Sequence, residues 1–341
     1  MKFLKKPKNK PLWLVILLDI LVAGMAVLTF AFFHHVLPAM LTQQQMQQSP
    51  VTPRPQPAQP VVMQTQPIGE DPTGESQTPD LRTQWQKKFE AQFTEDVVVT
   101  ENSYTSPEVS IHIETATVKY GNRESVCYIA DVYVASLANF LTHTAHGQMK
   151  YFDTQDAAEM ANEANAILAI SGDFLTYQKS GFLMRNGQLY ASDRNNTACV
   201  LYADGTMETF DKGAYTIEDV LAKDPVQVWS FGPALLDESG MVKDKYDVST
   251  AVSYPNPRAA IGYYEPGHYC LVVVDGRQDN SYGLTIPQLA QVFQDLGCTA
   301  AYNLDGGGSA VMIFNGQVYS HQSNGGRDLG DILIVTEAGE G

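Results

Sequence analysis

The stretch Asn303–Ser309 constrains the fold of this chain most, because it holds three consecutive glycines between two apolar runs. The glycines are Gly306, Gly307 and Gly308. Residues 299–304 and 310–314 predict strands on either side of a glycine-rich corner. Glycine permits positive φ and lets backbone N–H groups lie close to a bound ligand. Asp305 stands at the mouth of this corner and Ser309 at its exit, so the corner is a candidate binding site.

The segment ahead of the glycines predicts a βαβ unit. His268–Asp275 is an almost continuous apolar run, typical of a strand buried on both faces. Thr285–Gln288 has the composition of a helix start, with a Thr cap, a proline in the first turn and a Gln three residues on. Gly297 ends that helix. The two strands are therefore expected to be parallel, with Asp275 and Asp305 at the same sheet edge, where open α/β sheets bind ligands.

A third carboxylate follows another predicted strand. Asp153-Thr154 is expected to cap a helix over residues 155–165, and residues 166–170 form an apolar strand. Asp173 comes directly after it, in a corner that contains glycine. Alternating patterns elsewhere predict antiparallel strands with one wet face. The predicted fold class is α+β (mixed α/β), with a mixed β-sheet core, packed helices and one βαβ unit, preceded by a single transmembrane helix.

The first 34 residues predict a membrane anchor. Residues 1–10 carry five lysines and no acid, and residues 12–33 are apolar with few exceptions. A helix of that length spans the roughly 30 Å hydrocarbon core, whereas the apolar core of a cleaved signal peptide is normally about 7–15 residues. The lysines are expected to keep the N-terminus in the cytoplasm. We therefore predict a single-pass protein of the cell membrane whose C-terminal domain is extracellular.

Composition divides the chain into five segments. They are a basic cytoplasmic tail (1–10), a transmembrane anchor (11–34), a disordered Pro/Gln-rich spacer (35–80), a lead-in (81–105) and the main domain (106–341). The formal net charge is −16, and −21 without the first ten residues, which argues against nucleic acid as a partner. Four widely spaced cysteines contain no zinc or haem motif, and one disulfide is an option if the domain is extracellular.

Two sets of charged side chains suggest chemistry on a sugar phosphate. The candidate acids and bases are Asp173, Asp275 and Asp305, and the candidate anion binders are Arg258, Arg277 and Arg327. Carboxylates perform acid/base or nucleophilic work at an anomeric carbon, and guanidinium groups bind phosphate bidentately. The alternative is that these side chains form structural ion pairs. No cofactor is predicted, since His143 and His146 lack a third ligand, although a divalent cation on the carboxylates is the rival mechanism.

Seven motifs occur in a fixed order along the domain. They are Ala166–Phe174, Phe231–Leu235, Pro257–Gly262, Val274–Arg277, Gly283–Ile286, Leu296–Ser309 and Arg327–Ile332. This set resembles the phosphodiester glycosidase family over roughly residues 106–336. The resemblance implies an extracytoplasmic hydrolase that cleaves the C1–O bond of a sugar-1-phosphodiester in a glycan or envelope polymer, such as an exopolysaccharide.

The same resemblance implies site residues. It carries over Asp173, Asp275 and Asp305 as motif positions. Among them we expect Asp305 and Asp275 to form the catalytic pair, with Asp173 orienting sugar hydroxyls. Neither the resemblance nor the spacing assigns which member of the pair is the acid and which is the base or nucleophile. The substrate would be bound by the three arginines (Arg258, Arg277, Arg327), the three glycines and Ser309. Ser171 departs from the family, which usually has Asn there. A non-catalytic glycan-binding envelope protein and a metal-assisted phosphodiesterase are the alternatives.

Overall fold

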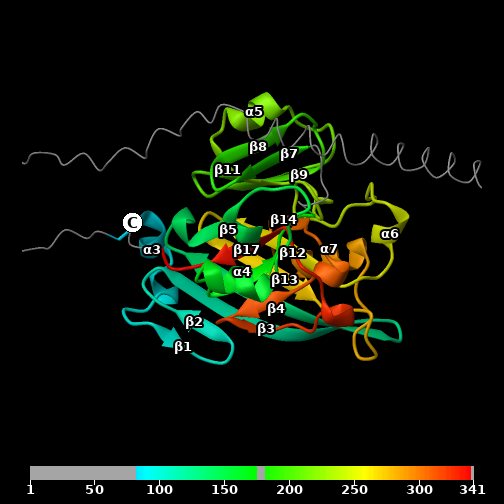
Figure 1. Cartoon of the computed structure of the whole chain (residues 1–341), viewed down its shortest axis with the longest axis horizontal. Helices are drawn as coiled ribbons and strands as arrows, with labels where there is room; N and C mark the ends of the chain where they lie inside the picture. Colours follow the sequence, from blue (N-terminus) through cyan, green and yellow to red (C-terminus); the bar gives the residue numbers. More distant parts are fainter. Residues whose placement is uncertain (1–81, 175–180, 339–341) are drawn as a thin grey trace, which may run out of the picture. The chain divides into compact units, whose positions relative to one another are not determined.

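The computed structural model describes residues 82–174 and 181–338 (Figure 1). All of them belong to the second of the chain's two compact units, Thr52–Gly341. The predicted tail, anchor and spacer lie outside the described residues. Among the helices of the described part, none has the length and apolar character needed to cross a membrane.

The described residues form three sheets. The first has seven strands in the order β1 (Val98–Val99), β2 (Ser103–Thr105), β3 (Val109–Tyr120), β4 (Arg123–Val134), β13 (His268–Val274), β12 (Arg258–Glu265) and β14 (Ala300–Asn303). The second runs β10 (Met207–Phe210), β9 (Ala198–Tyr202), β11 (Pro225–Trp229), β7 (Phe182–Arg185) and β8 (Gln188–Ser192). The third runs β16 (Gln317–Val318), β15 (Met312–Phe314), β6 (Leu168–Ser171), β17 (Asp331–Val335) and β5 (Phe140–Thr144).

Few helices accompany these sheets. In the described residues they are α3 (Gln84–Lys88), α4 (Ala157–Glu163), α5 (Ile217–Leu221), α6 (Thr250–Ser253) and α7 (Ile286–Asp295). Short 3₁₀ helices lie between α3 and α4 and after α7. Figure 1 shows the second sheet at the top of the view with α5 above it. The prediction of a sheet core with packed helices is confirmed. Within the described residues, however, each pair of hydrogen-bonded strands is antiparallel, so the predicted mixed sheet is wrong.

The predicted βαβ unit is present, but a strand separates its two halves. β12 pairs with β13 on one side and with β14 on the other, antiparallel in both cases, so β13 and β14 point the same way. β12 precedes β13 in a hairpin that turns at Gly267, and β4 occupies the other edge of β13. Both edges of β13 are thereby filled, and β14 pairs with the outer edge of β12 instead.

The capping residues predicted from the sequence are correct for α7 and wrong for the start of α4. For α7, Thr285 caps the helix, Gln288 completes the capping box and Gly297 follows the helix with a φ of 80°, as predicted. For α4 the predicted start was wrong. Asp156 is the cap, because its Oδ1 accepts from the N–H groups of Ala158 and Glu159, and the helix is shorter than 155–165.

Alternating side chains bury both faces of β13. Along β13, Leu271 and Val273 join a core shared with the other two sheets, while Cys270 and Val272 pack on the α7 side. The prediction that this strand is buried on both faces is confirmed. All four cysteines are buried free thiols, so the optional disulfide is not formed. The fold thus fixes the ends of β12, β13 and β14 rigidly at one edge.

Candidate active site

Asp305 lies at the centre of the glycine-rich corner that follows β14. Ser309 donates its hydroxyl to Oδ2 of Asp305 at 2.6 Å, and Nη2 of Arg327 donates to the same oxygen at 2.7 Å. Nε of Arg327 also donates to the Ser309 Oγ at 2.6 Å, which closes the triangle. Both hydrogen bonds to the Asp305 carboxylate end at Oδ2. The other oxygen, Oδ1, therefore has no hydrogen-bond partner among the described residues.

Burial makes Asp305 a weaker acid than a free carboxyl. Its exposed fraction is 6%, and this burial raises its pKa. The hydrogen bond from Ser309 and the positive charge of Arg327 oppose the rise, while the negative charge of Asp173 adds to it. Asp305 is therefore a carboxyl poised for proton transfer, with one oxygen fixed and the other unpartnered.

The surroundings of the three glycines in the corner differ, and so does the need for glycine at each position. A Cβ on Gly306 would lie 2.6 Å from the carbonyl oxygen of Pro257, so the close backbone packing there requires glycine. Gly307 has a φ of 62° and donates its N–H to the same carbonyl at 2.9 Å. A Cβ on Gly308 would meet only Arg327, at 3.9 Å. Packing within the protein therefore does not explain the third glycine.

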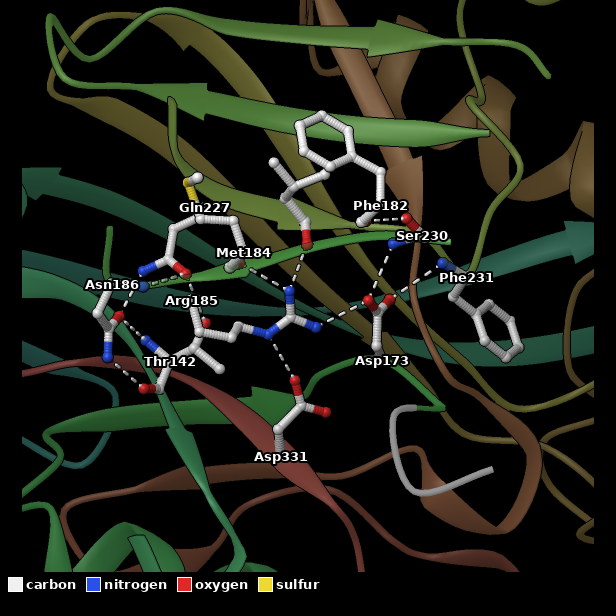
Figure 2. A network of polar contacts seen from close by, with 11 residues as sticks. Thr142, Asp173, Phe182, Met184, Arg185, Asn186, Gln227, Ser230, Phe231 and Asp331 are labelled. Carbon is white, nitrogen blue, oxygen red and sulfur yellow. Dashed lines mark hydrogen bonds and ion pairs between the residues drawn. The ribbon is translucent and has the colours of Figure 1, made fainter. Parts of the chain in front are cut away.

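Asp173 is held by a buried polar network (Figure 2). Its two oxygens accept from Nη2 of Arg185 at 2.8 Å and from the backbone N–H groups of Ser230 at 2.9 Å and Phe231 at 3.1 Å. Nε of Arg185 donates to Asp331 at 3.0 Å, so one guanidinium lies between two carboxylates, as Figure 2 shows. Both Asp173 oxygens are occupied by these contacts.

The Asp173 corner and the Asp305 corner are bound directly to each other. The N–H of Asp305 donates to the Gly172 carbonyl at 2.9 Å, and the Ser171 hydroxyl donates to the Asp305 carbonyl at 3.0 Å. Ser171, the departure from the family pattern, is fully buried and contributes to holding the catalytic candidate in place. Behind them, burial raises the pKa of Asp331 to about 7, against the opposing charge of Arg185.

Asp275 has a separate set of partners at the end of β13. Oδ1 accepts from the backbone N–H of His321 at 2.9 Å, and Oδ2 accepts from the Tyr128 hydroxyl at 2.9 Å. Nδ1 of His321 lies 3.1 Å from Oδ2 and 2.7 Å from the Tyr128 oxygen. Asp275 and Asp305 lie at the same sheet edge, as predicted. With β12 between their strands, those strands are roughly 10 Å apart, since neighbouring strands are about 4.8 Å apart.

One loop connects the two acidic corners. It joins β16 to β17, contacts Asp275 through His321 near its start, and contacts Asp305 through Arg327 near its end. Its short 3₁₀ helix η7 (Ser323–Gly325) packs against η6 (Gly307–Ser309) of the glycine corner.

The three predicted anion-binding arginines differ in their surroundings. Arg258 is buried, and its Nε and Nη2 donate to backbone carbonyls, among them Leu284 at 2.8 Å. Burial lowers the pKa of Arg258 to about 10, and the nearby charge of Arg277 adds to the effect. Arg277 is exposed, donates to Asn256 at 2.7 Å and lies beside Gly307. Arg277 and Arg327 thus flank the glycine corner, whereas Arg258 braces a neighbouring loop.

Three polar residues of this region were not assigned from the sequence: Arg185, His321 and Asp331. Asp331 lies inside the Arg327–Ile332 motif, which was a usable signal, but nothing local marks the other two. The pair His143 and His146 contacts separate acids, at 3.8 Å and 3.1 Å. Across residues 82–174 and 181–338, no three His, Cys, Asp or Glu side chains gather in a way that could hold a metal ion.

Comparison with known proteins decides the family. A family model described as phosphodiester glycosidase matches residues 164–336, a range that contains all three acidic corners and the loop between them. The chain belongs to the phosphodiester glycosidase family. This membership confirms the resemblance expected from the seven motifs.

Relatives of this chain include one of unknown activity and one with a named activity. The SPbeta prophage-derived uncharacterized protein YomE of Bacillus subtilis is 28% identical over 197 residues, 54% of this chain and 31% of the relative. Mouse N-acetylglucosamine-1-phosphodiester alpha-N-acetylglucosaminidase is 28% identical over 187 residues, 49% of this chain and 35% of the relative. The chain therefore spans about a third of the length of these curated relatives.

A solved structure shares the fold. The catalytic domain of zebrafish N-acetylglucosamine-1-phosphodiester alpha-N-acetylglucosaminidase, auto-inhibited by its pro-peptide, aligns with a TM-score of 0.58 and 22% identity. The alignment covers 71% of this chain and 88% of that one. It supports the sheet-rich fold with few helices described above.

Proposed function

We propose that this protein is a hydrolase that cleaves the C1–O bond of a sugar-1-phosphodiester, releasing the free sugar and a phosphomonoester. Family membership and the activity named for the mouse relative support this reaction class. The observation that carries it is the Asp305 carboxyl, which is buried, has a raised pKa and keeps one oxygen unpartnered beside an arginine. N-acetylglucosamine linked through its 1-phosphate is the first substrate to test.

Asp305 is assigned to the anomeric carbon. Ser309 and Arg327 fix Oδ2, which leaves Oδ1 to activate a water or to attack C1 itself. In either case the negative carboxylate stabilises the positive charge that develops on the sugar in an oxocarbenium-like transition state. Asp173 supports this group indirectly, since its own oxygens are occupied and its corner is bonded to the Asp305 backbone.

Arg277 and Arg327 are assigned to the phosphate. Both are exposed side chains on either side of the glycine corner, where a guanidinium can donate to phosphate oxygens. Gly308 leaves the backbone open to a ligand at the same place. Arg258 receives no direct role, because it is buried and its donors at Nε and Nη2 bind carbonyl oxygens of the protein, whereas the Arg327 side chain is exposed.

The lysines of residues 1–10 and the apolar run of residues 12–33 support an anchored location. We propose that the enzyme domain is held outside the cell membrane and acts on a sugar-phosphate glycan or envelope polymer. Protease added to intact cells should remove the domain, and complete protection while a periplasmic or surface marker is digested would contradict this placement.

Turnover of a defined substrate tests the proposed function. The full chain is incubated with an alkyl diester of N-acetylglucosamine-1-phosphate, and the products are followed by phosphorus NMR. Asp305→Asn should lower the rate by about 10²–10⁴-fold. Asp247→Asn, at an exposed aspartate, is the matched control and should retain the wild-type rate.

Three other outcomes would change the assignment. Binding of the diester without turnover would favour a glycan-binding protein. Loss of activity in EDTA with recovery in Mg²⁺ or Ca²⁺ would favour a metal-assisted phosphodiesterase. Release of sugar-1-phosphate instead of free sugar would show cleavage at phosphorus, and the reaction class would be wrong.

A further inference from the structure

We infer that His321, oriented by Asp275, is the proton donor to the leaving phosphate. This inference rests on the proposed function and adds a residue that neither the family motifs nor the spacing of acids identified. It also changes the role of Asp275, from a group that touches the sugar to a positioning residue that acts through a histidine.

The contacts of Asp275 orient the imidazole. The carboxylate binds His321 twice, at the backbone N–H (2.9 Å) and at Nδ1 (3.1 Å). Tyr128 donates its hydroxyl to the same carboxylate and lies 2.7 Å from Nδ1. A carboxylate accepts hydrogen bonds only, so it keeps the proton of the ring on Nδ1 and fixes the plane of the ring. The catalytic nitrogen is then Nε2.

Asp275 and His321 differ in their exposure to solvent. Asp275 is 3% exposed, whereas the His321 side chain is 71% exposed. Nε2 of His321 has no hydrogen-bond partner among the described residues, so it can meet a ligand. A buried carboxylate that orients an accessible imidazole is the arrangement used for proton transfer by histidine in hydrolases.

The loop between β16 and β17 connects His321 to the proposed phosphate site. The same loop carries Arg327 and packs through η7 against the glycine corner, where the phosphate is proposed to bind. The side chain of Gln278 donates to the His321 carbonyl at 2.6 Å, which ties this end of the loop to the turn after β13. Near the other end of the loop Arg327 binds Asp305, so the loop links the imidazole at the end of β13 to the carboxyl at the end of β14.

The chemistry of the leaving group suits an imidazole. When the C1–O bond breaks, its electron pair stays on the ester oxygen of the phosphate, whose conjugate acid has a pKa of about 6. A protonated imidazole is a common general acid in enzymes, so its Nε2–H is a suitable donor to that oxygen. The Nε2 proton passes to that oxygen, the hydroxyl of water joins C1, and the remaining proton of water passes to Asp305. Solvent then returns both groups to their starting states.

Replacement of His321 and rescue by a small molecule test the inference. His321→Asn keeps an amide donor near the position of Nδ1, and so keeps the bond to Asp275, but lacks Nε2. His321→Ala removes the whole ring at an exposed site that added imidazole can enter. Both variants of the full chain should hydrolyse the N-acetylglucosamine-1-phosphate diester about 10²–10⁴-fold more slowly, and imidazole should restore His321→Ala by at least tenfold.

Controls separate this inference from a structural role and from the proposed function. His112→Ala, at an exposed histidine of β3, should retain the wild-type rate with or without imidazole. Urea midpoints within error of wild type show that the variants are folded. A loss smaller than tenfold, or no rescue of folded His321→Ala at saturating imidazole, overturns the inference while leaving the proposed function intact. A wild-type chain without turnover overturns both.

Discussion

Arg185 should contribute more to stability than any exposed charge of this protein. Its guanidinium donates to Asp331 at 3.0 Å, to Asp173 at 2.8 Å, and to the carbonyls of Met184 and Val228. The side-chain exposure of the three charged groups is 0–2%. Removing one member of a buried ion pair costs about 3–5 kcal/mol, because the remaining charge is left without a partner. Arg185→Met keeps the volume but removes the charge and all five donors.

Urea unfolding of the full chain measures this cost. We expect a loss of about 3–5 kcal/mol in the free energy of unfolding, and a fall in melting temperature of roughly 6–20 °C for a domain of this size. Adding Asp331→Asn to Arg185→Met should recover part of the loss, since the second change removes an unpaired charge. Lys223→Ala breaks an exposed pair with Glu208 and should cost less than about 1 kcal/mol. A loss below about 1 kcal/mol in Arg185→Met would refute the reasoning.

Three further predictions concern the site itself. Burial raises the pKa of Asp331 to about 7, against about 3.9 in the unfolded chain, so its stabilising contribution is present below about pH 4 and is lost as the pH rises through 7. Asp331→Asn should therefore flatten the dependence of the urea midpoint on pH between these values. An unchanged dependence would contradict this. Ser309→Ala removes a bond that holds the pKa of Asp305 down, so the acidic limb of the pH profile of kcat/KM should move to higher pH rather than stay in place. Gly306→Ala should destabilise the protein by about 1–3 kcal/mol, because its methyl group would lie 2.6 Å from a carbonyl oxygen. Gly308→Ala should leave the urea midpoint unchanged and lower kcat/KM, because its methyl group would meet only Arg327. A fully active Gly308→Ala would show that the ligand does not approach the backbone at this position.

Features set by neighbouring residues were predictable from the sequence. The α7 helix begins and ends at its predicted signals because Thr285, Gln288 and Gly297 act within one turn of the helix ends. The hairpin at Asn315-Gly316 forms because both residues adopt positive φ, at 47° and 73°. The shared edge for Asp275 and Asp305 followed from the direction of their strands, which the helix between them determines.

Features set by distant residues were not predictable in this way. Asp331 lies 146 positions from Arg185, and His321 lies 46 positions from Asp275. No periodicity or cap links such pairs, since they meet only after the sheets assemble. The insertion of β12 between β13 and β14 has the same origin. A hairpin forms between β12 and β13 because they are adjacent in sequence, and apolar patterns alone do not rank that pairing against a direct β13–β14 contact.

The loop between β16 and β17 carries contacts to both groups that are proposed to act on the substrate. His321 and Arg327 are six positions apart, and each is attached to a carboxylate at the end of a different strand. A shorter span would hold the imidazole of His321 closer to Asp305, and a longer span would allow the two groups to lie farther apart. Family members with a different number of residues here should therefore prefer sugar phosphates of a different length, even where every charged side chain is retained.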